Sequence, residues 1–195
     1  MSGWSTVDDA RPADRRRSIG AASPFFIACV SELRAAADLG PVLDLACGRG
    51  RHTLASADLG LEVVAVDRNT DHLAELEGAL APDHRVETRP LDLEGDAPPD
   101  LGPARFGAVL VFRYLHRPLA PWIESLVAPG GLLVYETFTT AQRARGWGPS
   151  RDAFLLKPGE LASLFPNLDV VRFEEGPTDE PKPADTARLL ARRRR

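Results

Sequence analysis

Two short apolar segments in the first half of the chain each carry an acidic residue, and two glycines follow the first segment. Asp44 lies within the first apolar segment, which leads into Gly48 and Gly50, and Asp67 ends the second apolar segment. Glycine has no Cβ, so it permits a tight turn and a close approach of the backbone to a ligand. The helix expected after the glycines would direct free N–H groups at that ligand. A carboxylate about 20 residues further on suits the hydroxyls of a ribose. This spacing predicts a nucleotide-binding site.

These residues need strands and helices to position them, and the sequence supplies both in alternation. Residues 106–112 form a continuous apolar run, which is typical of a strand buried on both faces. Alternation of strands and helices predicts a parallel sheet covered by helices on both faces. The predicted strands are 42–46, 62–66, 85–91, 106–112, 132–138, 168–174 and 186–191, and the predicted helices are 24–39, 50–58, 70–81, 118–127 and 158–165.

The composition restricts the class of protein. The chain has 195 residues, a formal net charge of −4 and two cysteines. This length suits one domain, and the negative charge argues against general binding of nucleic acid. Two cysteines, Cys29 and Cys47, provide no disulfide framework and suit a reducing compartment. No apolar run approaches the roughly 18 residues that span a bilayer, and no metal-ligand spacing is present.

We therefore expect a cytoplasmic protein, a monomer or homodimer, with no metal and no membrane or nucleic-acid partner. Residues 1–20 are polar and rich in arginine and aspartate, without the apolar core of a signal peptide. They are expected to form a flexible arm, followed by a single domain over residues 21–195.

Arginine-rich loops are expected at the same edge of the sheet as the glycine loop. One loop follows the predicted strand 106–112, and the other, 139–157, is long enough to suggest a functional lid and contains Trp147. Ligands bind at the carboxyl edge of such sheets. These arginines are either solvated or form an anion-binding pocket, and Arg113 and Arg151 are the best candidates for the pocket. The arginines of the two loops are Arg113, Arg117, Arg143, Arg145 and Arg151.

Four segments resemble motifs of the class I S-adenosylmethionine (SAM) dependent methyltransferases. Residues 44–50 (DLACGRG) resemble the first motif, and Asp67 resembles the acid after the second strand. Asp92-Leu93 resembles the position that reads adenine, and residues 128–133 (APGGLL) resemble the turn before the fifth strand. The resemblance covers residues 23–175. It implies an α/β, Rossmann-like, doubly wound fold with a mostly parallel seven-stranded sheet and an antiparallel C-terminal strand, and it implies SAM as the cofactor.

A closer likeness involves the small bacterial methyltransferases of the tellurite-resistance and thiopurine-methyltransferase-like group. It rests on residues 23–25 (SPF), 114–118 (YLHRP) and 135–138 (YETF). This resemblance implies a small-molecule acceptor that is soft or anionic: a thiol, a selenium or tellurium oxyanion, or a carboxylate-bearing metabolite. Residues 112–116 (FRYLH) stand where methyltransferases of base amino groups carry an Asn- or Asp-Pro-Pro-aromatic motif. Methylation of DNA adenine or of release-factor glutamine is therefore not expected.

The resemblance also assigns roles to individual residues. Asp44 would support the loop and the methionine ammonium, Asp67 would hold the ribose, and Asp92 would accept from the adenine amino group. The expected SAM ligands are Asp44, Ala46, Cys47, Gly48, Gly50, His52, Asp67, Arg68, Asp92, Leu93 and Phe112.

The expected catalytic residues are Arg113, Tyr114 and His116. Methyl transfer requires above all that donor and acceptor are aligned and that water is excluded. A soft anionic acceptor needs no general base. An oxygen or nitrogen acceptor needs one, and His116 or Tyr114 is the candidate.

Two other classes of function compete with a methyltransferase. A nicotinamide-dependent oxidoreductase has a similar sheet, but His52-Thr53 stands where a third glycine would be, and the Pro-Gly-Gly turn is not usual in that class. A SAM-binding regulator or partner subunit without catalysis would have the same donor site, and only an acceptor pocket and turnover would distinguish it from an enzyme.

Overall fold

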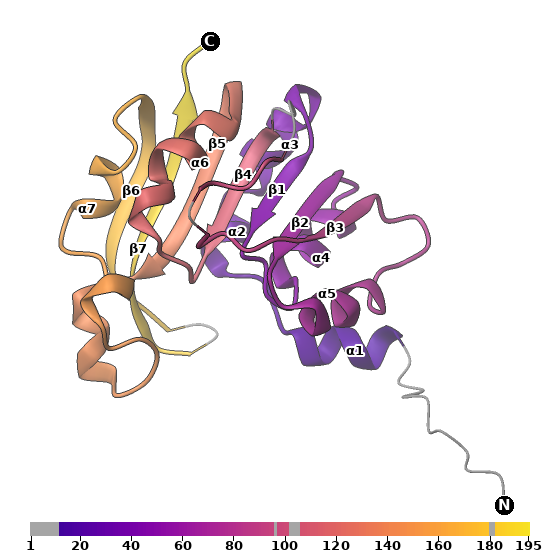
Figure 1. The fold of residues 1–195 in the computed structure, drawn as a ribbon, viewed down its shortest axis with the longest axis horizontal. Helices are drawn as coiled ribbons and strands as arrows, with labels where there is room; N and C mark the ends of the chain where they lie inside the picture. The colour runs from indigo at the N-terminus through magenta and orange to yellow at the C-terminus, as the bar shows by residue number, and fades with distance from the viewer. Residues whose placement is uncertain (1–11, 96, 102–105, 180–181) are drawn as a thin grey trace, which may run out of the picture.

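The fold is a single seven-stranded sheet with helices on both faces, seen in a computed structural model (Figure 1) that describes residues 12–95, 97–101, 106–179 and 182–195. The strand order is β3-β2-β1-β4-β5-β7-β6. β7 runs antiparallel to both of its neighbours, and the other pairs are parallel. The strands are β1 (Val42–Leu45), β2 (Val63–Asp67), β3 (Val86–Pro90), β4 (Phe106–Phe112), β5 (Val127–Phe138), β6 (Leu168–Thr178) and β7 (Ala184–Arg193). This arrangement confirms the predicted fold class.

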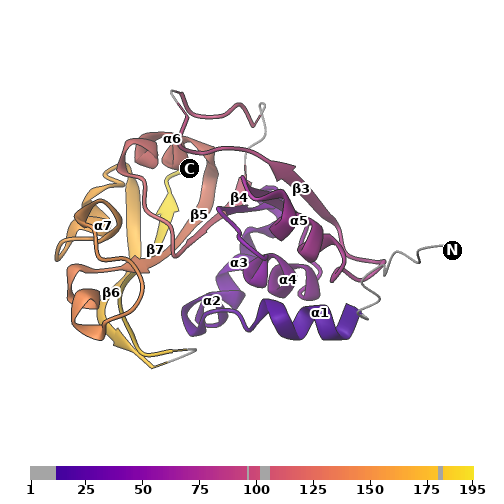
Figure 2. The same cartoon turned by 60° about the horizontal axis from the view of Figure 1, so that its bottom comes forward.

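Helices pack on the two faces of the sheet in separate groups (Figures 1 and 2). The group that includes α2 to α5 covers one face, and α6 and α7 cover the other. The α-helices are α1 (Pro12–Ile19), α2 (Pro24–Ala28), α3 (Val30–Ala36), α4 (Arg51–Asp58), α5 (Thr70–Glu77), α6 (Ala120–Leu126) and α7 (Glu160–Ser163), and the 3₁₀ turns are η1 (Ala37–Leu39), η2 (Arg117–Leu119), η3 (Thr140–Arg145) and η4 (Asp152–Phe154).

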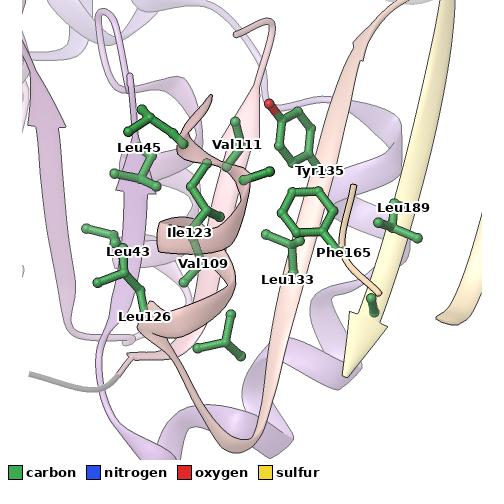
Figure 3. Packing of buried hydrophobic residues seen from close by; sticks show 14 of the residues in the cluster. Leu43, Leu45, Val109, Val111, Ile123, Leu126, Leu133, Tyr135, Phe165 and Leu189 are labelled. Carbon is green, nitrogen blue, oxygen red and sulfur yellow. The ribbon is translucent and has the colours of Figure 1, made fainter. Parts of the chain in front are cut away.

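The two hydrophobic cores meet at the central strands. Every residue of β4 is buried, because successive side chains point to opposite faces and both faces are covered. On one face Val109 packs with Ile123 and Phe165 (Figure 3). On the other face Leu110 packs with Phe26 of α2. Burial of these aliphatic and aromatic side chains contributes about 1.5–3 kcal/mol each, so the central strands are the most strongly held part of the sheet.

The expected N-terminal arm differs from the structure over its second half. Residues 1–11 lie outside the described part of the chain, whereas residues 12–19 form α1, which lies beside α4 and α5 (Figure 2). Arg16 donates to Asp58 over 2.5 Å and Ser18 donates to Glu75 over 2.8 Å. Ile19 is buried at the end of the helix. The polar composition that predicted flexibility serves instead to pair α1 with charged residues of its neighbours.

β5 begins earlier than predicted, at Val127 rather than at residue 132. Val127 pairs with Phe106 of β4, and a register shift follows before Ala108 pairs with Leu132. A Cβ at Gly131 would lie 2.8 Å from the Gly107 carbonyl oxygen, so only glycine permits this close approach. The APGGLL segment therefore forms an irregular start to β5 rather than a free turn before it.

Candidate functional site

The sheet order reverses between β1 and β4, and this reversal defines where a ligand binds. β2 and β3 lie on one side of β1, and β4 and β5 continue on the other side. Loops that leave the carboxyl ends of two such strands diverge to opposite faces and leave a crevice between them. The loop 46–50 follows β1, and Arg113 follows β4. Both lie at this crevice, as the sequence predicted.

The loop after β1 has the backbone that its glycines predict. Ala46, Gly48 and Gly50 all have positive φ, at 54°, 57° and 82°. Gly50 also lies against α5, because a Cβ there would meet the Leu76 side chain at 2.5 Å. At Gly48 a Cβ would meet no atom within 4 Å. The first glycine thus keeps the loop open toward the crevice, and the second lets it pack on the protein.

Asp67 connects this loop to β2. Its Oδ2 accepts a hydrogen bond from the Gly48 amide over 2.7 Å, and its Oδ1 accepts from the Asn69 amide over 2.9 Å. Asn69 itself caps α5 by accepting from the amides of Asp71 and His72. Asp67 is therefore not needed as the helix cap. Each carboxylate oxygen keeps a further lone pair for a ligand hydroxyl.

Asp44 lies beneath the loop and is fully buried. Its Oδ2 accepts from the Thr53 hydroxyl over 2.7 Å. Burial raises the pKa of Asp44 from its ordinary value to about 7, against the opposing effect of the Thr53 hydrogen bonds. A carboxyl group in this position gains a stable charge when a cationic group binds beside it.

Two cavities meet at this loop. The larger one measures about 510 Å³ and the smaller one about 160 Å³, and Ala46 lines both. The larger cavity is lined by Ile19, Asp44, Ala46, Cys47, Gly48, Arg49, Arg51, His52, Phe112, Arg113, Phe138, Trp147 and Lys182. The smaller cavity is lined by Ala46, Asp67, Arg68, Leu91, Asp92, Leu93, Glu94 and Tyr114. The two linings contain every expected SAM ligand except Gly50, which shapes the loop from behind.

The smaller cavity is lined by an acidic side chain, Asp92, and by a tyrosine hydroxyl, that of Tyr114. Asp92 is exposed, and its Oδ1 accepts from the Glu94 amide over 2.9 Å, which fixes the start of the loop after β3. Leu93 is buried beside it. The Tyr114 hydroxyl is buried without a hydrogen-bond partner. A buried polar group without a partner is unfavourable, so Tyr114 has a donor and acceptor available to a ligand in this cavity.

A buried polar cluster supports the larger cavity, and no sequence pattern predicts it. Glu136 of β5 is buried and accepts a short hydrogen bond from the Ser23 hydroxyl. The Ser23 amide donates to Nε2 of His52 over 3.2 Å. His52 stacks on Phe112, with the ring centroids 3.7 Å apart. Ser23 and Glu136 are 113 residues apart in the chain, so no local pattern could reveal their contact.

His52 forms part of the cavity wall as a neutral imidazole. Burial is the main cause that holds its pKa well below the ordinary value, and the nearby Arg51 and Arg113 act in the same direction. Because Nε2 accepts from Ser23, the proton of the neutral ring resides on Nδ1. Cys47 also lines the cavity, and burial raises the pKa of its thiol. The thiol is therefore unreactive.

Arg113 is the one arginine of the two predicted loops that lines the larger cavity. Its φ is +60°, which is unusual for a residue with a side chain, and its amide donates to the Glu136 carbonyl oxygen over 2.8 Å. Its guanidinium lies 3.6 Å from Glu136 Oε1 and 4.3 Å from the centre of the Phe138 ring. Strained residues at a cavity are often functional.

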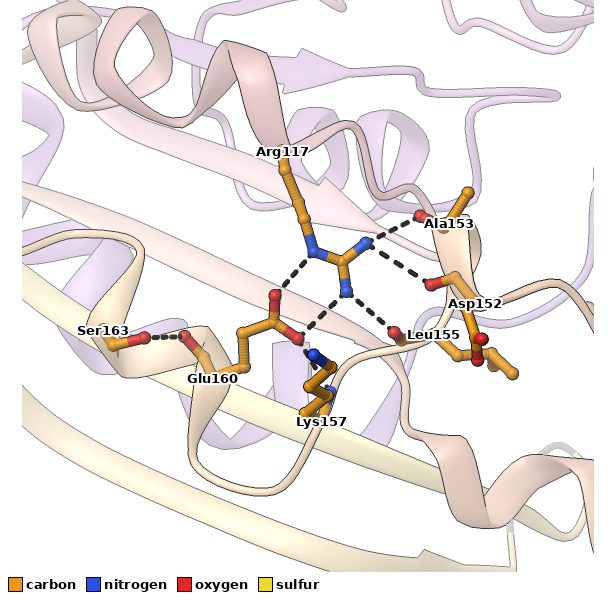
Figure 4. A network of polar contacts seen from close by, with 7 residues as sticks. All are labelled: Arg117, Asp152, Ala153, Leu155, Lys157, Glu160 and Ser163. Atoms are coloured by element: carbon orange, nitrogen blue, oxygen red, sulfur yellow. Dashed lines mark hydrogen bonds and ion pairs between the residues drawn. The ribbon is translucent and has the colours of Figure 1, made fainter.

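The other arginines are held by partners in the protein. Arg117 donates to both carboxylate oxygens of Glu160, over 2.5 and 2.9 Å, and to three backbone carbonyl oxygens of residues 152–155 (Figure 4). Arg143 pairs with Asp152, and Arg145 pairs with Asp185. Arg151 is exposed and lines neither of the two cavities. The expected arginine pocket is thus reduced to Arg113, and the other ion pairs fix the loop 139–157.

The loop 139–157 forms one wall of the larger cavity. Trp147 packs edge-on against Phe138, with centroids 5.7 Å apart. The Trp147 indole N–H donates to the Pro183 carbonyl oxygen, and the Trp147 carbonyl oxygen accepts from the Gln142 side chain. Lys182 lies 4.2 Å from the centre of the Trp147 ring. The wall therefore joins this loop to the β6–β7 hairpin.

The three residues predicted to be catalytic lie in different places. Arg113 lines the larger cavity, whereas Tyr114 lines the smaller one and a further cavity of about 180 Å³. His116 is half-buried before η2 and lines none of these three cavities. Arg51 lines the larger cavity although the sequence analysis did not select it. Its position one residue after Gly50, in the first turn of α4, was the available signal.

A family model and several solved structures are similar to this chain. Residues 42–131 match the family model of a methyltransferase domain. The structure is similar to TehB from Haemophilus influenzae (18% identity, TM-score 0.65, 84% of this chain and 62% of that protein). It is also similar to magnesium protoporphyrin IX methyltransferase from Synechocystis with bound S-adenosylhomocysteine (18%, TM-score 0.64, 93% and 94%). A third similar structure is a SAM-dependent methyltransferase from Mesorhizobium loti (20%, TM-score 0.63, 85% and 98%). No curated protein sequence matched the chain.

The matched segment contains the loop after β1 and the end of β2, and the sheet order together with the similar structures shows the class I methyltransferase fold. The part of this chain that aligns with TehB covers 62% of the length of TehB. No helix among the described residues is long and apolar enough to cross a membrane. The described residues also contain no group of three or more histidine, cysteine, aspartate or glutamate side chains arranged to hold a metal ion.

Proposed function

We propose that this protein transfers the methyl group of SAM to a small anionic acceptor bound in the larger cavity. The observation that carries the proposal is the meeting of the two cavities at Ala46, beside the loop after β1. The smaller cavity suits an adenosine. The larger one, at about 510 Å³, lies within the range of roughly 300–1,000 Å³ for small-molecule sites, so it has room for the methionine end of SAM and for a second molecule.

The residues of both cavities fit SAM. Asp67 and Asp92 would hold the ribose and the adenine, and the unpartnered Tyr114 hydroxyl offers a further hydrogen bond in that cavity. The open space at Gly48 would admit the methionine end, and Asp44 would face its ammonium. When bound, SAM supplies a methyl group already activated by a positive sulfonium.

The chain's own residues then have to align the acceptor and exclude water. Phe112, Phe138 and Trp147 supply apolar walls, and Arg113 supplies a positive charge. An acceptor that is already ionised needs no general base. The site supports this choice, because the pKa of His52 is held well below its ordinary value and burial raises the pKa of Tyr114 above its ordinary value. A base role for His116 has no cavity contact to support it.

Four further parts of the proposal rest on sequence. We place the chain in the tellurite-resistance and thiopurine-methyltransferase-like group on the SPF, YLHRP and YETF segments. We propose one domain over residues 21–195, against which α1 packs. We also propose a cytoplasmic location and a monomer or homodimer without nucleic-acid partners, in line with the net charge of −4.

The proposed function is tested by measuring the conversion of SAM to S-adenosylhomocysteine in the presence of candidate acceptors. Purified protein is incubated with SAM and with separate thiols, selenite, tellurite and aromatic carboxylates, and the release of S-adenosylhomocysteine is measured by mass spectrometry. We expect release with one of these classes, and none with the Gly48→Val variant. Tight SAM binding without release for any acceptor would favour a regulatory SAM-binding protein instead.

A further inference from the structure

The larger cavity is cationic although the whole chain is acidic. Its charged lining residues are Arg49, Arg51, Arg113, Lys182 and one carboxyl group, Asp44, in a chain of net charge −4. Arg49 is paired with Glu75 over 3.3 Å, and Lys182 lies over the Trp147 ring. The two arginines closest to the glycine loop and to β4, Arg51 and Arg113, therefore dominate the charge of the cavity.

Arg51 would bind the carboxylate group of SAM. It lies in the first turn of α4, next to the loop that would receive the methionine end of SAM. Within the described residues its guanidinium has no hydrogen-bond or ion-pair partner at contact distance, and Glu136 and Asp44 are the nearby carboxylates that attract it. SAM carries a single carboxylate, which one arginine can bind in bidentate fashion. The ammonium and the sulfonium of SAM add positive charge, so the bound cofactor supplies no second anion for Arg113, whose one carboxylate neighbour among the described residues is Glu136.

Arg113 is held in place without using all its donors. Glu136 Oε1 lies 3.6 Å from the guanidinium, which exceeds the length of a hydrogen bond. Arg113 Nε is buried with no partner. The Phe138 ring lies against one face of the guanidinium at 4.3 Å. The buried Glu136 and the stacked ring thus orient a planar fork of N–H donors that still has sites for a ligand.

The remaining walls are aromatic. Phe112 and Phe138 line the cavity from the ends of β4 and β5, and Trp147 closes it from the loop 139–157. Phe112 and Phe138 are buried except for the edges that line the cavity, at 6% exposure each, and Trp147 is half-buried. A compact oxyanion would reach the arginine but would leave the exposed apolar surface of Trp147 and these two edges facing water. A flat apolar body would cover them.

We infer that Arg113 is the specificity-determining residue of the acceptor site and that the acceptor is a small aromatic carboxylate, with its carboxylate bound to Arg113 and its ring against Phe138 and Trp147. This inference rests on the proposed function and deepens it.

The test is calorimetric binding of benzoate and 2-naphthoate to the protein saturated with S-adenosylhomocysteine. Benzamide and 2-naphthamide are the neutral controls, and selenite is the compact anion. We expect one or both carboxylates to bind, with the matching amide at least tenfold weaker and selenite weaker still. Equal binding of the acid and its amide, binding of selenite alone, or no binding of either carboxylate up to 10 mM (about the weakest affinity that would matter) overturns the inference.

Variants at Arg113, with matched controls at other arginines, assign the effect to Arg113. Arg113→Met should weaken carboxylate binding at least tenfold and change S-adenosylhomocysteine affinity by less than about threefold. Arg151→Met removes the same charge from an exposed position outside the cavities and should change neither. Arg113→Lys, which keeps the charge and loses the fork, checks any fold defect and should show intermediate binding. If Arg113→Met weakens S-adenosylhomocysteine as much as Arg51→Met does, Arg113 is a cofactor ligand and the inference fails.

Failure of the proposed function gives a different result. A wild-type protein that does not bind S-adenosylhomocysteine contradicts the proposed function directly. The carboxylate and amide titrations are then repeated without it, and the preference for the acid still decides the role of Arg113.

Discussion

The Gly48 amide donates a hydrogen bond of 2.7 Å to Oδ2 of Asp67, 19 residues further along the chain. This contact joins the loop after β1 to the end of β2, at the place where the two strands pair in parallel. One carboxylate therefore does two things. It fixes the glycine loop, and it presents its remaining lone pairs to the cavity that suits the ribose.

Replacing Asp67 should weaken the binding of SAM more than it weakens the fold. Asp67→Ala removes charge-assisted hydrogen bonds, and we expect a loss of about 1.5–3 kcal/mol in SAM binding by calorimetry. Asp83→Ala removes the same charge from an exposed turn before β3 and should leave SAM affinity unchanged. Equal SAM affinity in the Asp67 variant and the wild type would remove Asp67 from the cofactor site.

The pH dependence of stability should report the buried Asp44. Its pKa is raised to about 7 in the folded protein, against about 3.9 in an unfolded chain. The folded state thus binds the proton more tightly, and the stability due to this proton is full below pH 4 and is lost as the pH rises to about 7. Relative to Asp44→Asn, the wild type should lose unfolding free energy between pH 4.5 and 7 in urea titrations. Parallel curves for the two proteins would contradict the raised pKa.

Variants at two glycines of similar backbone conformation distinguish a loss of SAM binding from a loss of the fold. Gly48 and Gly60 both have positive φ and open space where a Cβ would lie, so valine at either position pays a similar backbone cost, of at least about 1–2 kcal/mol. Only Gly48 lines the larger cavity. We expect Gly48→Val to remain folded by circular dichroism and to lose SAM binding, whereas Gly60→Val should bind SAM normally. Normal SAM binding by the Gly48 variant would refute the assignment of the loop.

Ser23 should stabilise the protein through its buried hydroxyl. The hydroxyl donates to Glu136 and accepts from the Phe25 amide over 3.1 Å as the cap of α2. Ser23→Ala removes both contacts and should lower the unfolding free energy by about 1–3 kcal/mol. Ser31→Ala, whose hydroxyl donates to Glu32 at the surface, should stay within about 0.5 kcal/mol of the wild type. Equal effects of the two variants would show that the buried cluster adds no stability.

The sequence predicted those parts of the molecule whose cause is local. β4 has the predicted bounds, 106–112. An uninterrupted apolar run is stable only where both faces of the strand are buried, so it indicates a central strand. The glycine loop has the expected positive φ because few other residues tolerate it. Asp67 lies at this loop because the crossover between β1 and β2 has the usual length.

The sequence could not predict which arginines face the cavity. Arg117 and Arg145 pair with Glu160 and Asp185, which are distant in the sequence and are brought close only by the tertiary structure. Arg113 also has a carboxylate neighbour, Glu136, yet its side chain lines the cavity. The contact between Ser23 and Glu136 was not foreseen because these residues are also distant in the sequence. Helix α1 was mistaken for part of an arm because its stabilising partners, Asp58 and Glu75, lie on other helices.

The most direct test of the account is calorimetric titration of the purified protein with SAM and with S-adenosylhomocysteine, with NADH as the control. The account predicts micromolar binding of the first two and no binding of NADH, because Asp67 and the glycine loop lie beside the cationic cavity in which we propose that the methionine end binds. Binding of NADH, or binding of neither SAM nor S-adenosylhomocysteine, would contradict it.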